Sequence, residues 1–178
     1  LQRQMALHLG TLILRAEAIS DRTDCALNWS ATAPEPTRVA VLHAIGRLLR
    51  DGPANEPDEA WADLIGPYWE ARIGHRPIPL SEDEASALVE LLPTFDTALS
   101  DAIRLALRSP AVLGPWARLV SDLRLDLVER HADEIAELLT YLLKQSAGPI
   151  WVADKLKALF EKLKAHATVE HVHDLREA

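Results

Sequence analysis

The residue types that most often carry out chemistry are few in this chain, and their spacing does not suit a metal site. Three histidines lie near the C-terminal end, His166, His171 and His173, followed by Asp174. Residues two apart on a helix point to different faces, so His171 and His173 would not bind one metal ion together. His171 and Asp174 could share a face, but two ligands do not complete a site. We therefore predict no metal site.

Nucleophilic and cofactor chemistry is equally poorly supported. The single cysteine, Cys25, has no histidine close in sequence to activate it, and one cysteine excludes both an internal disulfide and a zinc site of several thiolates. The chain contains no glycine-rich phosphate loop, no Gly-x-Ser-x-Gly motif, no His-Glu-x-x-His motif and no pair of Glu-x-x-His motifs. We predict no catalytic residue and no cofactor; an enzyme with an unrecognised site in a groove between helices is the alternative.

The residues best suited to binding are aromatic. Trp61 and Trp69 lie eight apart, about two helical turns, and so share a face of a helix. Arg72 follows Trp69 by three residues and Tyr68 by four, so its guanidinium could cover either ring or pair with acids near Glu70. Interfaces favour Trp, Tyr and Arg, but Trp also fills cores, and for Trp69 we favour the core. The candidates for interaction or packing are Trp61, Tyr68, Trp69, Arg72, Trp116 and Trp151.

Helices must position these side chains, because apolar residues recur with a helical period along almost the whole chain. We expect helices over residues 2–19, 37–50 and 59–73, and further helices whose apolar stripes run from Ala85 to Leu92, Phe95 to Ala106, Trp116 to Leu127, Ile135 to Leu142, Val152 to Leu163 and from Thr168 onward. A long loop is expected over residues 20–36, where Pro, Asn, Asp and Ser interrupt the pattern. No strand is expected.

Local signals predict where several helices begin or bend. Asp58 is the expected N-cap of the helix over residues 59–73, and Gly66-Pro67 should kink or split that helix. Ser81 and Glu84 have the spacing of a capping box, in which the hydroxyl and the carboxylate each accept from a free backbone N–H.

The predicted fold is therefore a single all-α domain over residues 1–178, with eight or nine short helices. Gly114-Pro115 and Gly148-Pro149 both precede helices and lie 34 residues apart, a spacing typical of a helix-pair repeat. An irregular, HEAT-like solenoid of helix pairs and a helical bundle both remain open. The chain begins without Met and already in helical pattern, so we expect it to be a piece of a longer polypeptide.

Charge narrows the kind of partner. The net charge is −8, which argues against nucleic acid, and residues 51–101 alone hold 12 acids against two arginines, a net −10. This acidic middle is either a solvated surface or a docking face for a basic partner or another domain of the same parent chain. No signal peptide and no apolar run long enough for a membrane occur, and cysteine is scarce, so we expect a cytoplasmic protein.

Four segments carry a resemblance to a known family. They are Ala60-Trp61 to Tyr68-Trp69-Glu70-Ala71-Arg72, Pro79-Leu80-Ser81-Glu82-Asp83-Glu84-Ala85, Leu107-Arg108-Ser109-Pro110, and Leu142-Leu143-Lys144-Gln145 to Gly148-Pro149-Ile150-Trp151. Over residues 40–175 the chain resembles a helical domain of unknown function at the C-terminal end of large bacterial sirtuin-like proteins, some associated with phage defence. There, cleavage of the nicotinamide cofactor belongs to an N-terminal sirtuin-like domain that this chain lacks. The resemblance implies a regulatory, sensing or scaffolding domain.

Overall fold

The computed structural model describes residues 33–51, 57–74, 79–109, 117–145 and 153–178, and 84% of these residues are helical. No strand occurs in these ranges, so the predicted all-α class is confirmed. The elements are α3 (Glu35–Asp51), α4 (Pro57–Ala60), the π-helix η1 (Trp61–Ile65), α5 (Gly66–Gly74), α6 (Glu82–Val89), the 3₁₀-helix η2 (Leu92–Thr94), α7 (Leu99–Leu107), α8 (Ala117–Asp122), α9 (Leu125–Arg130), α10 (Ala132–Gln145), α11 (Ala153–His166) and α12 (Val169–Glu177).

Several features predicted from the sequence fall outside the described residues. They are the helix over residues 2–19, Cys25, the expected loop up to residue 32, the pairs Gly114-Pro115 and Gly148-Pro149, Trp116 and Trp151. The end of the expected loop is helical, because α3 begins at Glu35 and not at residue 37. Pro36 is tolerated there, since the first turn of a helix leaves its N–H groups without intrahelical partners anyway.

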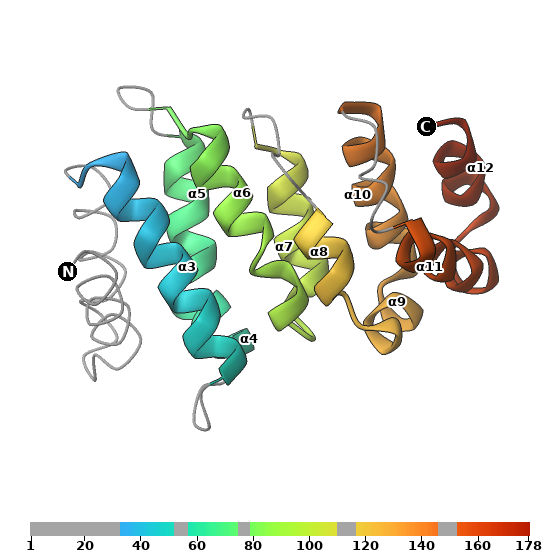
Figure 1. The fold of residues 1–178 in the computed structure, drawn as a ribbon, viewed down its shortest axis with the longest axis horizontal. Coiled ribbons are helices and arrows are strands. Elements are labelled where there is room, and N and C mark those ends of the chain that lie inside the picture. The colour runs from blue at the N-terminus through green and yellow to red at the C-terminus, as the bar shows by residue number, and fades with distance from the viewer. Residues whose placement is uncertain (1–32, 52–56, 75–78, 110–116, 146–152) are drawn as a thin grey trace.

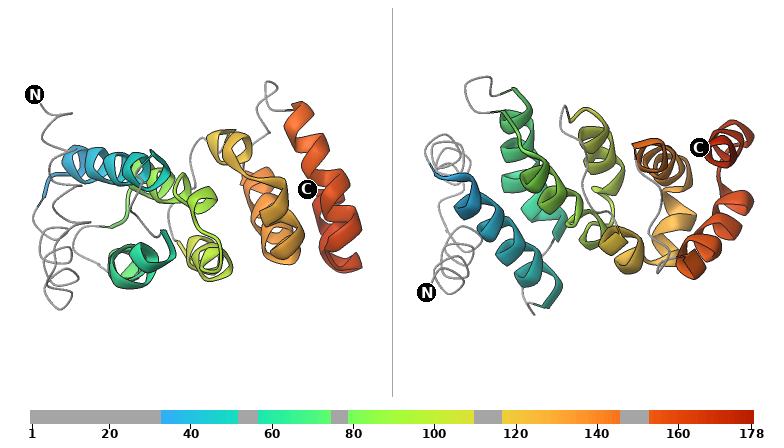
Figure 2. Two further views of the ribbon diagram at one scale, coloured as in Figure 1. Left: turned by 90° about the horizontal axis from the view of Figure 1, so that it is seen from below. Right: turned by 45° about the horizontal axis from the view of Figure 1, so that its top comes forward.

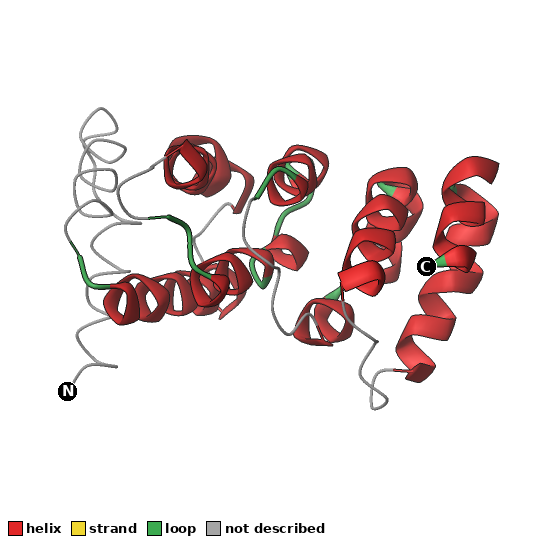
Figure 3. Ribbon diagram, turned by 90° about the horizontal axis from the view of Figure 1, so that it is seen from above, coloured by secondary structure: helices red, strands yellow, loops and turns green. Residues whose placement is uncertain are grey.

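The helices follow one another in chain order along the long axis of the molecule (Figure 1). Seen from below, with the long axis still horizontal, they form two layers, with α3, α6 and α8 in one and α5, α7 and α10 in the other (Figure 2, left). Only helices and connecting loops are present in the described part of the chain (Figure 3). One continuous cluster of buried apolar side chains extends through the layers, from Val41 in α3 to Leu175 in α12.

The expected kink at Gly66-Pro67 takes the form of a π-helical turn. The N–H of Gly66 bonds to the carbonyl of Trp61, five residues back, and α5 then begins at Gly66 itself. The wider turn accommodates the ring of Pro67, which would clash with a carbonyl in a continuous α-helix. Glycine suits this position, because a Cβ atom would make tight contacts, 3.1 Å from the Trp61 carbonyl oxygen and 3.2 Å from Trp61 Cε2.

Two further boundaries differ from the predicted ones. The helix expected from Trp116 to Leu127 is interrupted: α8 ends at Asp122, and α9 begins at Leu125 after Arg124 adopts extended backbone angles. The helix expected from Phe95 begins at Leu99. Phe95 itself is extended and only 1% exposed, so it serves the core without being helical.

Asp58 does not cap its own helix, so that prediction is wrong. α4 begins one residue earlier, at Pro57, and the Asp58 carboxylate crosses to the turn before α7. There it accepts hydrogen bonds from the backbone N–H groups of Asp96 at 2.9 Å, Thr97 at 2.8 Å and Ala98 at 3.4 Å, and from the Thr97 hydroxyl at 2.6 Å. Asp58 thus binds the N–H groups of the turn that leads into α7 and joins α4 to that turn.

We predict that Asp58→Ala lowers the free energy of unfolding by about 1–2 kcal/mol, as the loss of a helix N-cap does. Partial burial raises the pKa of Asp58, but the hydrogen bonds from Thr97, Asp96 and Ala98 outweigh it and hold the pKa below its usual range. This stabilisation should therefore be present at neutral pH and disappear as pH falls through the lowered pKa. Urea melts at several pH values measure it. The matched control is Glu59→Ala, an exposed neighbour; equal effects of the two variants would contradict the assignment.

Candidate functional site

Two of the predicted candidate residues, Tyr68 and Arg72, converge on a buried carboxylate. Both lie on the inner face of α5, and Glu84 lies opposite them in the first turn of α6. The Tyr68 hydroxyl donates to Glu84 Oε1 at 2.6 Å. Arg72 donates through Nε to Oε1 at 2.8 Å and through Nη2 to Oε2 at 3.0 Å. This bidentate contact was not predicted from the sequence, which paired Arg72 with an aromatic ring or with acids near Glu70.

A second arginine completes the group from another helix. Arg38 of α3 donates to Glu84 Oε2 through Nε at 3.2 Å and through Nη2 at 3.0 Å. Both guanidinium groups also donate to backbone carbonyls: Arg38 through Nη1 to Ala33 at 2.5 Å, and Arg72 through the same Nη2 to Pro79 at 3.3 Å. We call Arg38, Tyr68, Arg72 and Glu84 the Glu84 cluster; it joins α3, α5 and α6.

The Glu84 cluster is closed to solvent and holds one ionised carboxylate. Exposure of the Arg38, Arg72 and Glu84 side chains is 3%, 1% and 0%. Burial raises the pKa of Glu84, but hydrogen bonds from Arg72, Arg38 and Tyr68 outweigh burial and hold that pKa below its usual range. Burial and the adjacent carboxylate raise the pKa of Tyr68, so its hydroxyl stays protonated and donates. A carboxylate with five donors and no access to solvent fits a structural role better than proton transfer.

The predicted capping box at the start of α6 is half correct. The Ser81 hydroxyl accepts from the Glu84 backbone N–H at 3.2 Å, as the motif requires. The Glu84 carboxylate does not return to the Ser81 N–H, because it is directed into the core toward the two arginines. A residue that the sequence identified only as a cap is therefore the centre of the buried cluster.

The two tryptophans of this region have different environments. Trp69 is 0% exposed, and its indole N–H has no hydrogen-bond partner among the described residues. Trp61 is partly buried and packs edge-on against Trp69, with ring centroids 6.3 Å apart, and against Phe95 at 5.2 Å. Trp69 therefore packs in the core and is not exposed to a partner. Trp61 belongs to the same group of aromatic rings but reaches the surface.

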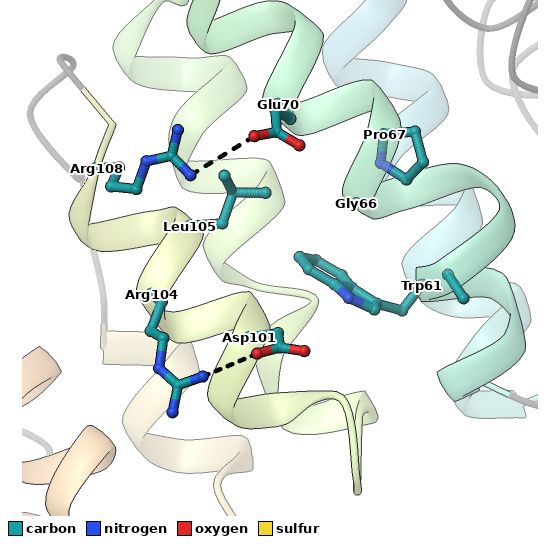
Figure 4. A pocket seen from close by; sticks show the side chains of 9 residues that line it. Trp61, Gly66, Pro67, Glu70, Asp101, Arg104, Leu105 and Arg108 are labelled. Atoms are coloured by element: carbon teal, nitrogen blue, oxygen red, sulfur yellow. Dashed lines mark hydrogen bonds and ion pairs between the residues drawn. The ribbon is translucent and has the colours of Figure 1, made fainter.

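Trp61 lines a groove between η1–α5 and α7, which we call the Trp61 groove (Figure 4). Its volume is about 450 Å³. The lining residues are Trp61, Ala62, Gly66, Pro67, Glu70, Asp101, Arg104, Leu105 and Arg108. The indole projects from η1 toward α7, with Leu105 opposite it (Figure 4). The charged side chains of the groove are exposed to solvent, so it lacks the convergent buried polar groups typical of an active site.

The acidic middle of the chain is partly neutralised in the folded protein. Arginines that lie later in the sequence pair with its acids: Arg108 with Glu70, Arg104 with Asp101, Arg118 with Glu90, and Arg124 and Arg130 with Asp96. The described segments 57–74 and 79–109 still hold ten acids against three arginines, a net −7. The exposed acids Glu59, Glu82 and Asp83 have no ion pair to another described residue.

One of the C-terminal histidines, His171, makes structural contacts. His171 does not act together with Asp174, because its Nδ1 lies 3.1 Å from Asp133 of α10 and 2.8 Å from the Thr168 hydroxyl. Asp133 also accepts from the Thr168 backbone N–H at 2.7 Å, which fixes the start of α12 against α10. In the described part of the chain, no three His, Cys, Asp or Glu side chains are grouped to hold a metal ion.

Comparison with known proteins adds no relative. No family model, no curated protein and no solved structure matches the chain. The resemblance to a domain of sirtuin-like proteins thus stays a prediction. Among the described helices, none has the length and apolar character needed to cross a membrane.

We predict that Trp69→Ala lowers the free energy of unfolding by about 3–5 kcal/mol, as truncation of a large buried aromatic does. Trp69 is fully buried beside Trp61, so its loss leaves a cavity in the core. A urea melt measures the effect. Trp69→Phe is the matched control: it keeps a ring and removes the unpaired N–H, so it should cost less. A midpoint unchanged by the alanine substitution would contradict the burial.

We predict that Glu84→Gln is destabilising by about 3–5 kcal/mol, because it leaves two buried arginines without their counter-charge. The lowered pKa of Glu84 means that its stabilisation is complete above the unfolded-state pKa of about 4.3 and is lost as pH falls through the lower folded-state value. Melts from pH 3 to pH 7, a range of about four pH units around that value, should show a weaker pH dependence in the variant. Glu82→Gln, an exposed change on the same helix, is the control.

Proposed function

We propose that this chain is a non-catalytic helical interaction, sensing or scaffolding domain of a larger intracellular bacterial protein, corresponding by resemblance to the C-terminal part of a sirtuin-like protein. The observation that carries the proposal is the Glu84 cluster. The buried ionisable side chains of the described residues satisfy one another there, away from solvent. The charged side chains of the Trp61 groove are exposed, an arrangement that suits binding better than acid–base chemistry.

Stacked helix pairs are the arrangement we propose for the domain, in place of a bundle. On the side of α3, α6 and α8, contacts join α3 with α6 and both α8 and α9 with α11. On the other side, contacts join α5 with α7, α7 with α10 and α10 with α12. This stacking of successive helices supports an irregular, HEAT-like solenoid, a form that presents extended binding surfaces.

The partner we propose is basic: another domain of the parent chain or a separate cytoplasmic protein, and not a nucleic acid. The net charge of −7 over the segments 57–74 and 79–109 supports this proposal. A negative surface speeds the encounter with a basic partner and repels anionic ones. Ion pairs with arginines neutralise some of the surface carboxylates, but Glu59, Glu82 and Asp83 stay exposed.

The alternative function is an enzyme with a site in an inter-helix groove, and the Trp61 groove is the candidate for that site. The charged side chains that line the groove are exposed to solvent, which gives that alternative less support than binding receives. Incubation of the purified chain with NAD should release no nicotinamide, because the cofactor-cleaving chemistry of sirtuin-like proteins belongs to a domain that nothing in this sequence resembles. Release of nicotinamide would contradict the non-catalytic proposal.

A kinetic experiment tests the basic partner. The probe is a ten-residue peptide of alternating Lys and Gly, with alternating Glu and Gly as its control. We expect the association rate of the lysine peptide with the whole chain to fall as ionic strength rises, since salt screens steering beyond about 10 Å at 0.1 M. The glutamate peptide should not bind. A salt-independent rate, or tighter binding of the glutamate peptide, would contradict the proposed partner.

A further inference from the structure

A second, smaller pocket lies between α11 and α12, at one end of the row of helices (Figure 1). Its volume is about 250 Å³, and it is lined by Phe160, Leu163, Lys164, Val172, Leu175 and Arg176. All six residues belong to α11 and α12, so no other described helix closes the pocket. The end of a stack of helix pairs needs a polar outer face, or a further chain, to cover its apolar residues.

The lining of this pocket is apolar at its base and positive at its edge. Leu163 is 0% and Leu175 7% exposed, whereas the charged lining residues, Lys164 and Arg176, are exposed and both basic. Glu161, outside the lining, accepts from Lys164 at 2.6 Å, but Arg176 forms no ion pair with another described residue. With Glu161 counted, the site is still net positive. It therefore fits an apolar group that carries an acid.

α12 also presents an apolar side chain that nothing in the described structure covers. Val169 is 87% exposed, against 38% for Leu125, the other exposed large hydrophobic residue in the described ranges. A single exposed valine is ordinary by itself. Val169 is followed directly by Glu170, which is exposed and forms no ion pair with another described residue. Val169-Glu170 is thus an apolar group beside an acid, the chemistry that the pocket fits.

Val169 and the pocket lie on the same side of α12. Residues three and seven apart are separated by about 60° and about 20° around a helix, so Val169, Val172 and Arg176 form one stripe about 10 Å long. A two-fold axis perpendicular to α12 near Val172 would place Val169 of each copy opposite Arg176 of the other. The match then occurs twice, as a self-complementary interface requires.

We infer that the pocket between α11 and α12 receives Val169 of a second copy of this chain, with Glu170 of that copy paired to Arg176. One contact accounts for two features that a single copy leaves unexplained: the exposed valine and the arginine without an ion pair. The contact involves few residues, so the dimer is weak and reversible. It concerns the α11–α12 end alone and does not depend on the basic partner.

Sedimentation equilibrium of the whole chain measures the dimer. We expect monomer at about 10 μM and a growing share of dimer toward about 1 mM, the range of a weak contact. Val169→Ser should weaken dimerisation about tenfold or more, because each dimer loses two buried valines. Leu125→Ser, at the other exposed hydrophobic residue, is the control and should leave the dimer unchanged.

An exchange of charges tests the ion pair. Glu170→Arg and Arg176→Glu should each weaken dimerisation about fivefold or more, because like charges then meet twice in the dimer. A mixture of the two variants should recover it, since each residue 170 again faces an opposite charge at residue 176. Asp174→Arg, on another side of α12, is the control and should leave the dimer nearly unchanged. These residues are exposed, and urea melts check that each variant remains folded.

Three results would overturn the inference. A chain that stays monomeric up to about 1 mM does not fill this pocket with a second copy. A dimer that Val169→Ser leaves intact forms through another surface. Failure of the mixed charge variants to recover the dimer, when each alone has lost it, would show that Glu170 and Arg176 do not meet.

Discussion

One ionised carboxylate in the core sets the arrangement of α3, α5 and α6. Glu84 is fully buried, and burying a charge is costly unless it is both paired and hydrogen-bonded. Arg38 of α3 and both Tyr68 and Arg72 of α5 supply five donors, so the charge on α6 is stabilised only when the three helices meet in one geometry. Apolar packing alone would permit many rotations of these helices; a directional cluster permits far fewer.

The need to pair Glu84 also determines which residues line the Trp61 groove. Because Tyr68 and Arg72 must face Glu84, the rest of the π-turn and α5 is placed as well: Trp69 enters the core, and Trp61 and Glu70 come to the surface beside α7. Asp58 fixes the other side of this contact by binding the N–H groups before α7. The Trp61 groove is therefore lined by elements that two buried or half-buried carboxylates hold in place.

Helical periodicity was sufficient to predict the all-α class and most helices, since apolar stripes report burial directly. Boundaries that depend on distant partners were not predictable. Asp58 has the sequence signature of a local cap, yet its partners lie some 40 residues away, at Asp96 to Ala98. Glu84 likewise matched a local motif, but Arg72, Tyr68 and Arg38, which lie 12, 16 and 46 residues earlier, give its carboxylate another role. The groove needed two helices placed side by side, and spacing within one helix cannot show that.

The π-turn at Trp61–Ile65 makes the register of α5 depend on one residue. A π-turn is equivalent to a single residue inserted into an α-helix, and each residue of an α-helix advances the chain by about 100° around its axis. A deletion of one residue within this turn would restore regular α-helix and rotate everything after it by that angle. Tyr68 and Arg72 would then swing away from Glu84. Homologous chains that keep this buried cluster should therefore tolerate changes of residue type within the turn more readily than changes of its length.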